Sequence, residues 1–178
     1  MRIISGVQKG KRLYPGKGFK ARPTTDFAKE NLFNVLSNYL DFEDLVVLDL
    51  FSGTGSISFE FSSRGSRQVE SVEINSRYHA FIMKTSRELG FNNLNAIRTD
   101  AFRFLKHTIR EYDLIFADPP FEIGGLDQLP LLVFSRNLLK PGGWFILEHG
   151  KDHDFSGHAR FRELRKYGSV HFSIFVNE

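Results

Sequence analysis

The sequence predicts an α/β fold in which a mostly parallel sheet carries helices on both faces. Between residues 46 and 149, short apolar runs alternate with segments of helical periodicity, a pattern typical of βαβ units. Near the end of the chain, two strand-like runs are separated only by Gly168-Ser169. This gap leaves no room for a crossover helix, so the last two strands must form an antiparallel hairpin at the sheet edge.

The first 40 residues are predicted to form a basic hairpin, a loop and a helix. Residues 2–4 and 12–14 are strand-like, and the glycine- and lysine-rich stretch between them favours a turn. A flexible basic loop follows at 16–18. Residues 27–40 then place apolar side chains at helical spacing, after a run of N-cap candidates that includes Thr25.

The alternating part of the chain supplies the sheet. Glycine after residue 89 and the Pro141-Gly142-Gly143 segment are typical helix stops. We expect seven strands, at 46–50, 68–73, 95–99, 114–118, 144–149, 161–167 and 170–176, and helices at 55–63, 76–89, 102–109 and 126–139. A chain of 178 residues is long enough to bury a sizeable core as one domain with a small extension. We place the extension at 1–25 and the main domain at 26–178.

The charge is concentrated at the start of the chain. Residues 1–30 contain eight Lys and Arg against Asp26 and Glu30, a net of +6, while the remainder carries 16 basic and 19 acidic residues, a net of −3. A basic arm on a slightly acidic body favours contact with an anionic polymer. A solubilising tail is the alternative that the charge alone leaves open.

Several function classes are excluded or disfavoured by composition. Cysteine is absent, which excludes disulfides and mechanisms with a Cys nucleophile, such as covalent methylation of pyrimidine carbon 5. No apolar run approaches about 18 residues and no apolar signal segment begins the chain, so we expect a cytoplasmic protein. The segment 149–158 holds His149, His153 and His158, but it lacks a supporting acid cluster and is interpreted as a polar loop without a metal.

The most informative motif is Asp118-Pro119-Pro120-Phe121, directly after the apolar run 114–117. Two prolines after a strand end stiffen the turn. We therefore expect the Asp118 carboxylate and the Pro119 carbonyl to face a ligand as fixed acceptors beside the Phe121 ring. Such an arrangement suits the exocyclic amine of a nucleobase, whose hydrogens the acceptors bind while the ring stacks on the base. A purely structural turn is the alternative.

A second motif lies at 48–55, where a strand runs into a Gly-x-Gly turn and a helix begins. The glycines Gly53 and Gly55 are expected to let the backbone approach a ligand closely. A dinucleotide fingerprint is a poor match because Ser58 stands at the third glycine position. Asp49 would also lie awkwardly near a pyrophosphate, whereas it suits the ammonium of a methionine moiety.

Two more acidic residues fall at the ends of predicted strands. Glu73 ends the second strand, where it suits the two hydroxyls of a ribose, and Asp100 follows the third strand beside Ala101, where an adenine would lie. Carboxyl ends of parallel strands meet at one edge of a sheet, so these groups are expected to share a site with Asp49.

A parallel sheet with an antiparallel final strand resembles class I S-adenosylmethionine-dependent methyltransferases, and it argues against a nicotinamide dehydrogenase. The two motifs together resemble methyltransferases of exocyclic base amines. The segments Arg2-Ile3-Ile4-Ser5-Gly6, Arg22-Pro23-Thr24-Thr25-Asp26 and Leu32-Phe33-Asn34 resemble the RsmD-like family of bacterial 16S ribosomal RNA guanine-N2 methyltransferases. Phe27 and Lys29 depart from that family, which usually has Arg at both positions.

This resemblance implies S-adenosylmethionine as cofactor and a seven-stranded Rossmann-like sheet. It also implies direct transfer of the methyl group to a flipped guanine of ribosomal RNA, either naked or in a partly assembled small subunit. It implies a monomer without a metal; an adenine-N6 methyltransferase is the alternative. The implied catalytic residues are Asp118, Pro119 and Phe121, and the implied cofactor-binding residues are Asp49, Phe51, Gly53, Gly55, Glu73, Asp100 and Ala101. The expected RNA contacts are Arg2, Lys9, Lys11, Arg12, Lys17, Arg22, Thr24, Thr25 and Lys29.

Overall fold

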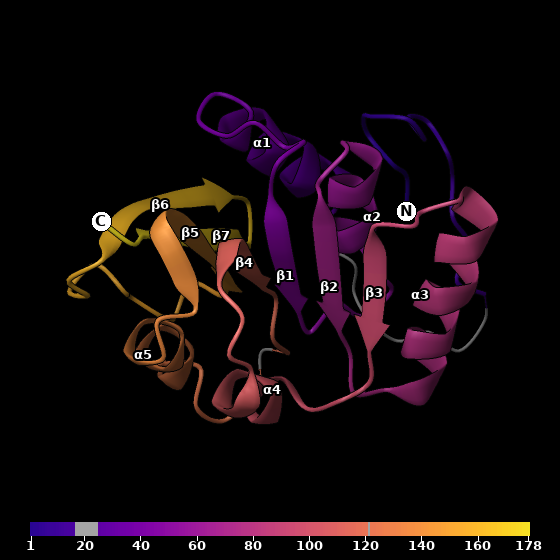
Figure 1. Ribbon diagram of the computed structural model, residues 1–178. Helices are drawn as coiled ribbons and strands as arrows, with labels where there is room; N and C mark the ends of the chain where they lie inside the picture. The colour runs from indigo at the N-terminus through magenta and orange to yellow at the C-terminus, as the bar shows by residue number, and fades with distance from the viewer. Residues whose placement is uncertain (17–24, 121) are drawn as a thin grey trace.

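The computed structural model describes residues 1–16, 25–120 and 122–178, and it forms a three-layer α/β sandwich (Figure 1). The alternation of apolar runs and helical segments produces the elements in the expected order. The helices are α1 (Asp26–Leu36), α2 (Ser56–Ser63), α3 (Ser76–Leu89), α4 (Ala101–His107) and α5 (Gln128–Ser135). The strands are β1 (Val46–Leu50), β2 (Gln68–Val72), β3 (Leu94–Ile97), β4 (Tyr112–Ala117), β5 (Leu139–His149), β6 (Phe161–Tyr167) and β7 (Val170–Val176).

The seven strands form one sheet in the order β3-β2-β1-β4-β5-β7-β6. The first five in this order pair in parallel, and β7 is antiparallel to both of its neighbours. The predicted mostly parallel seven-stranded sheet with an antiparallel last strand is therefore confirmed. The strand order reverses between β1 and β4, and an opening at the carboxyl ends of these strands is the usual ligand site of such a sheet.

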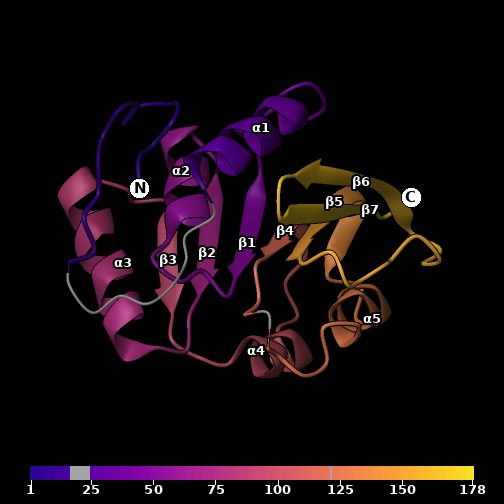
Figure 2. The same cartoon turned by 180° about the vertical axis from the view of Figure 1, so that it is seen from behind.

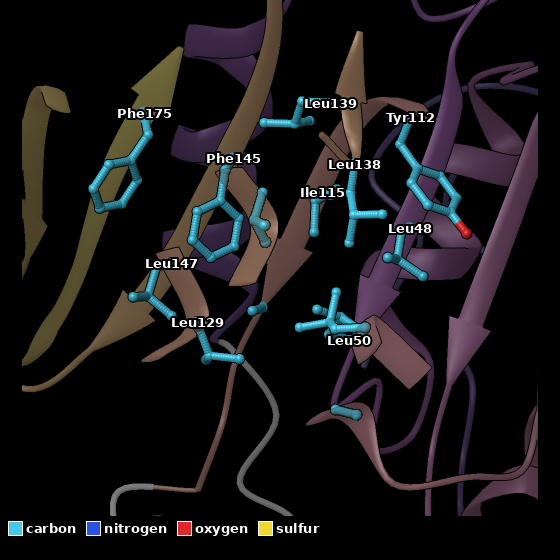
Figure 3. Close-up of a cluster of buried hydrophobic side chains, with 14 of the residues drawn as sticks. Leu48, Leu50, Tyr112, Ile115, Leu129, Leu138, Leu139, Phe145, Leu147 and Phe175 are labelled. Carbon is cyan, nitrogen blue, oxygen red and sulfur yellow. The ribbon is translucent and has the colours of Figure 1, made fainter. Parts of the chain in front are cut away.

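Both faces of the sheet are covered by helices because apolar side chains point to both sides of the parallel strands. One face packs against α1 and α2 through Leu32, Phe33 and Phe61. The other face packs against α4 and α5, and Figure 3 shows part of this cluster around Phe145 and Leu129. No helix in the described part of the chain is long and apolar enough to cross a bilayer.

The first 13 residues, here called the N-terminal hairpin, pack against α2 and α3, as Figures 1 and 2 both show. The amide of Ile3 donates to the Lys11 carbonyl and the amide of Leu13 donates to the Met1 carbonyl, each at 3.0 Å. Ile3 and Leu13 are buried beside Phe59, Ile82 and other apolar residues of the two helices. The predicted hairpin is confirmed, and its apolar side chains contribute to the core.

One turn of the hairpin fits only glycine. Gly6 adopts φ +80°, and a Cβ built there would lie 1.8 Å from the carbonyl oxygen of Ser63. Its neighbour Val7 donates an amide hydrogen bond of 2.8 Å to the same oxygen. The backbone of the hairpin thus contacts the last turn of α2 without an intervening side chain.

Three helices end earlier than the sequence predicts, including the one predicted at 102–109, which ends at His107. The segment 27–40 is helical only to Leu36, and the segment 126–139 is helical only from 128 to 135. In the latter segment Asn137 adopts φ +52° and the amide of Leu138 donates back to the Val133 carbonyl. This is a helix-terminating turn in which Asn takes the place of the more usual glycine, so the strand β5 begins before Pro141 rather than after it.

Candidate active site

A cavity of about 450 Å³ opens at the carboxyl ends of β1, β2 and β4. The strand ends, the glycine turn after β1 and the Asp118-Pro119 turn after β4 together form its walls. Parallel pairing of β1 with both β2 and β4 brings these ends to one edge of the sheet. The cavity contains Asp49, Phe51, Gly53, Glu73, Asp100, Ala101, Asp118 and Pro119, which the sequence singled out.

The turn after β1 is held in left-handed backbone conformations. Gly53 has φ +53° and Gly55 has φ +78°, and the non-glycine residue Phe51 has φ +57°. Such a φ is rare for an aromatic residue and indicates a backbone fixed by its surroundings. The Phe51 ring lines the cavity and packs edge-on against Phe102 at 6.1 Å between centroids.

Gly55 has a role other than the expected close approach to a ligand. A Cβ at this position would lie 2.9 Å from Ile82 Cγ1 and 3.0 Å from the Phe59 ring, in the apolar contact between α2 and α3. Gly55 is also absent from the described cavity lining. Its small size therefore permits helix packing, while Gly53 is the glycine that borders the cavity.

Asp49 lies at the bottom of the cavity, is almost completely buried and accepts hydrogen bonds from the amide and the hydroxyl of Ser58. These donors belong to the first turn of α2, whose positive end favours a carboxylate. Burial nevertheless raises the pKa of Asp49 to about 7, and the charge of Asp118 contributes to the rise against the hydrogen bonds from Ser58.

Glu73 follows β2 and orients its carboxylate by two backbone hydrogen bonds. The amide of Gly53 donates to Oε2 at 2.8 Å, and the amide of Asn75 donates to Oε1 at 2.7 Å. Burial raises the pKa of Glu73 above its ordinary value, while the bonds from Asn75 and Gly53 lower it. Each carboxylate oxygen can accept a further bond, so Glu73 can hold a pair of hydroxyl groups on the cavity side.

Beyond Glu73 the cavity has apolar walls, and the first turn of α4 borders it. Ile74 lines it although 63% of this residue is exposed to solvent, and Tyr78 of α3 lies on the same wall. Asp100 accepts from the amide of Arg103 at 2.8 Å and caps α4, so Ala101 begins that helix beside the cavity. A flat ring fits between such walls, with polar groups only at its rim.

The opposite end of the cavity is formed by the turn after β4. Asp118 and Pro119 line it together with Phe116 and Pro120. Phe121, predicted to stack on a base, lies outside the described residues.

The charge of the cavity favours a positively charged ligand. Five carboxylates line it, those of Asp49, Glu73, Asp100, Asp118 and Glu148, and the described lining includes no Lys, Arg or His. A pyrophosphate would meet repulsion from these groups, whereas an ammonium or sulfonium would be attracted. The electrostatics therefore disfavour a dinucleotide more directly than the glycine pattern does.

Three lining residues from the end of the chain were not predicted from the sequence. Glu148 of β5 and the pair Ser169-Val170 at the β6–β7 turn border the cavity near Asp118. The position of Ser169-Val170 depends on β7 inserting between β5 and β6, whereas that of Glu148 follows from the parallel pairing of β5 with β4. Of these residues, only Glu148 could have been identified from the sequence, because a carboxylate inside the apolar run 144–149 is unusual in a buried strand.

The histidines of the 149–158 segment have structural contacts. His149 is buried, and its ring nitrogens lie 2.8 Å from the Ser173 hydroxyl and 2.7 Å from the Gly150 carbonyl oxygen. Burial lowers the pKa of His149. Within the described residues, no group of three His, Cys, Asp or Glu side chains is arranged to hold a metal.

The basic residues of the N-terminal hairpin point to solvent. Lys9, Lys11 and Arg12 are exposed, and the half-exposed Arg2 lies 3.7 Å from Glu30. Thr25 caps α1 by accepting from the Ala28 amide and also borders the cavity. The other predicted RNA contacts, Lys17, Arg22 and Thr24, lie outside the described residues.

The prediction that Lys29 contacts RNA is wrong. Only 1% of Lys29 is exposed, because it lies on the buried side of α1. Its ammonium donates to the Arg2 carbonyl at 2.6 Å and to the Ser56 hydroxyl at 3.1 Å, and it lies 3.8 Å from Glu60 Oε2. Lys29 therefore ties the hairpin to the start of α2. Its place three positions before Leu32 was a sequence signal for this orientation.

Comparison with known proteins identifies the family of the chain. The family model described as Conserved hypothetical protein 95 matches residues 1–176. The chain is 30% identical to the ribosomal RNA small subunit methyltransferase D of Buchnera aphidicola subsp. Baizongia pistaciae, with 99% of this chain and 92% of the relative aligned. The Escherichia coli protein of the same name is 31% identical over 83% of this chain and 71% of its own length.

A solved structure of a related protein has the same fold. The Escherichia coli protein yhhF, described as a candidate methyltransferase, is 26% identical and superposes with a TM-score of 0.87 over 100% of this chain and 98% of its own. The sheet and its antiparallel final strand are those of the class I S-adenosylmethionine-dependent methyltransferases. The chain therefore belongs to the family of the ribosomal RNA small subunit methyltransferase D proteins.

Proposed function

We propose that this protein transfers a methyl group from S-adenosylmethionine to the exocyclic N2 amine of a guanine in small-subunit ribosomal RNA. The observation that carries the proposal is one acidic cavity that joins the glycine turn and Glu73 to the Asp118-Pro119 turn. The names of the relatives support ribosomal RNA of the small subunit as the substrate.

The residues at the glycine-turn end fit the cofactor. A volume of about 450 Å³ lies within the range of pockets that enclose small molecules. Glu73 would accept from the ribose hydroxyls, Ile74 and Ala101 would enclose the adenine, and Asp49 would attract the ammonium group. When bound, S-adenosylmethionine supplies an electrophilic methyl group on a positively charged sulfur.

Asp118 and Pro119 would position the amine that accepts the methyl group. The lone pair of a guanine amine is delocalised into the ring, which makes the nitrogen a poor nucleophile. Acceptors at the Asp118 carboxylate and the Pro119 carbonyl would bind the two amine hydrogens and favour a more tetrahedral nitrogen. A carboxylate there also stabilises the positive charge that develops during transfer. Positioning and electrostatics are then the main catalytic contributions.

The substrate base must leave its stack to reach Asp118, and the exposed cations of the hairpin would hold the RNA backbone while it does so. Lys9, Lys11 and Arg12 present these cations on a rigid support, because Ile3 and Leu13 fix the hairpin on α2 and α3.

The decisive experiment incubates the protein and labelled S-adenosylmethionine with ribosomal RNA from cells that lack the gene. We expect N2-methylguanine as the labelled nucleoside after digestion of the small-subunit RNA. N6-methyladenine as the product would replace the proposal with the alternative activity, and an unlabelled RNA would reject both.

Asp118→Ala tests the assigned site in the same assay. We expect single-turnover transfer to fall by about 10²-fold or more with cofactor affinity preserved, because positioned groups of this kind supply a few kcal/mol to the transition state. Asp152→Ala is the matched control, since Asp152 is an exposed loop residue outside the cavity lining. A near wild-type rate for Asp118→Ala would make the Asp-Pro-Pro-Phe turn structural.

A further inference from the structure

Phe27 is an aromatic residue near the rim of the cavity, and 67% of it is exposed to solvent. It belongs to the first turn of α1 and follows Thr25, which borders the cavity, by two positions. A phenyl ring in water gains nothing for the stability of the fold, since its apolar surface stabilises only when it is covered. The surroundings of Phe27 indicate what covers it when the protein binds its substrate.

The ring of Phe27 contacts Tyr167, the last residue of β6. The two ring centroids lie 6.4 Å apart with an interplanar angle of 85°, an edge-to-face arrangement that aromatic pairs prefer. Tyr167 also packs against the core cluster of this face of the sheet, so it is a fixed support. The turn that follows it borders the cavity at Ser169 and Val170, and Figures 1 and 2 both show this turn beside α1. The aromatic pair therefore connects two segments of the cavity rim.

The charges around Phe27 favour contact with a nucleobase over contact with a phosphate. Asp26 precedes Phe27, Glu30 follows it by about one helical turn, and both carboxylates are partly exposed. Together with the carboxylates of the cavity, they repel an RNA backbone at this place. Stacking on the uncharged face of a base is not opposed in this way, and it contributes substantially to the binding of unpaired nucleotides.

Phe27 also lies between the cavity and the N-terminal hairpin. Along α1, Thr25 borders the cavity, and Glu30 lies 3.7 Å from Arg2 of the hairpin. An RNA strand that contacts Arg2 and places one base in the cavity would cross the exposed ring between them. A base that leaves its stack deprives its neighbour of a stacking partner, and an aromatic side chain is the usual replacement in the recognition of unpaired RNA.

We propose that Phe27 stacks on a base adjacent to the flipped guanine, with Tyr167 fixing the orientation of its ring. This inference rests on the proposed function and adds to it a contact that captures the RNA. Phe27 then acts on RNA binding, whereas Asp118 acts on methyl transfer.

The test combines variants of the full chain with variants of the RNA. After mass spectrometry of nuclease fragments has located the methylated guanine, small-subunit RNA is joined from two pieces. One piece carries an abasic residue on the 5′ or the 3′ side of that guanine. With enzyme in excess over RNA, the enzyme concentration that gives half of the maximal single-turnover rate measures capture, and the maximal rate measures transfer.

On intact RNA, Phe27→Leu should raise the half-saturating enzyme concentration by about tenfold, the effect typical of one lost base–aromatic stack. The maximal rate should stay within about threefold of the wild-type value. With one of the two abasic RNAs, the wild type should show the same increase, and Phe27→Leu should add no further loss, because the stacking partner is already absent.

Three controls separate stacking from other roles. Phe27→Tyr keeps a ring and should capture RNA within about threefold of the wild type. Tyr39→Leu removes another exposed aromatic residue at the opposite end of α1, where Tyr39 packs against Trp144 with 5.4 Å between ring centroids, and it should not change capture. In Phe27→Leu the midpoint of urea denaturation should be unchanged, and so should the slope of log affinity against log salt concentration, because no phosphate contact is lost.

The outcomes distinguish this inference from the proposed function. If the wild type methylates guanine, additive losses with both abasic RNAs overturn the role of Phe27, as does wild-type capture by Phe27→Leu. A Phe27→Leu variant that lowers only the maximal rate also overturns it, because the residue would then support the cavity. A wild type that transfers no methyl group to guanine rejects the proposed function and the role of Phe27 with it.

Discussion

Two glutamates hold two backbone segments in the same way but in regions with different roles. Glu60 of α2 accepts from the amides of Ile4 and Ser5, at 2.8 and 3.0 Å, and fixes the N-terminal hairpin. Glu73 accepts from the amides of Gly53 and Asn75 and fixes the glycine turn. Both carboxylates therefore position main chain that carries a proposed ligand contact.

The difference lies in what completes each hydrogen-bonding shell. Glu60 is fully buried, and Lys29 and Arg64 lie within 3.8 and 2.9 Å of its oxygens, so its partners all belong to the protein. Glu73 borders the cavity, where further lone pairs are available to a ligand. The contact with a cavity, rather than burial or residue type, separates a structural carboxylate from a binding one.

The largest expected effect is the loss of stability on removing Glu60. Glu60→Ala leaves the Lys29 ammonium without its buried counter-charge and the amides of Ile4 and Ser5 without their acceptor, and the free energy of unfolding should fall by about 3–5 kcal/mol. Urea denaturation measures this change. Cofactor affinity of the folded fraction should remain within about threefold, since Glu60 does not line the cavity. If Glu60→Ala lowered the free energy of cofactor binding more than the free energy of unfolding, Glu60 would itself be a binding residue and the distinction between the two glutamates would fail.

Glu73→Ala should produce the opposite pattern. We expect cofactor binding to weaken by about 1–3 kcal/mol through lost charge-assisted bonds to hydroxyl groups, as measured by calorimetry. Its effect on the free energy of unfolding should be smaller than that of Glu60→Ala, because water can reach the two amides through the cavity. Unchanged affinity would mean that Glu73 only supports the glycine turn.

Asp49, the buried carboxylate of the cavity, should make cofactor binding depend on pH. The free Asp49 carboxyl has a pKa of about 7, and a cationic ligand favours its ionised form. Affinity should therefore decrease as the pH falls below about 7, by up to about tenfold per unit. In the ligand-free protein, pH changes stability in the opposite direction. Folded Asp49 keeps its proton up to a higher pH than unfolded Asp49, so its contribution to the free energy of unfolding decreases as the pH rises from about 4 to 7. Asp49→Asn should remove both dependences.

The smallest expected effect concerns the exposed side of the hairpin. Replacing Lys9, Lys11 and Arg12 by Gln should reduce the slope of log affinity against log salt concentration by about 0.7–0.9 per lost phosphate contact. These side chains are exposed, so stability should be nearly unchanged. Filter binding of ribosomal RNA at several salt concentrations measures the slope. An unchanged slope would support the solubilising role instead. Deleting the hairpin is a poorer test, because Ile3 and Glu60 would lose their partners.

Much of the cavity could be predicted from local sequence because parallel strands bring their carboxyl ends together whatever the rest of the chain does. Asp49, Glu73 and Asp118 needed only that rule. Ser169-Val170 could not be placed, because their position depends on which strand β7 joins. Glu148 follows the same rule as Asp118, since β5 pairs in parallel with β4, but it was overlooked as part of an apolar run. Lys29 was misassigned because residue type was given more weight than its side of the helix.

The turn of Gly6 against Ser63 also has a consequence for the order of folding during synthesis. The hairpin is made first, but its partners Ser63 and Leu89 are added seconds later at ordinary translation rates. The apolar side chains of Ile3 and Leu13 therefore remain exposed to solvent or to a chaperone until α2 and α3 form. The cavity is completed later still, since Val170 closes its wall. A nascent chain that stops before β7 therefore lacks one part of the cavity wall.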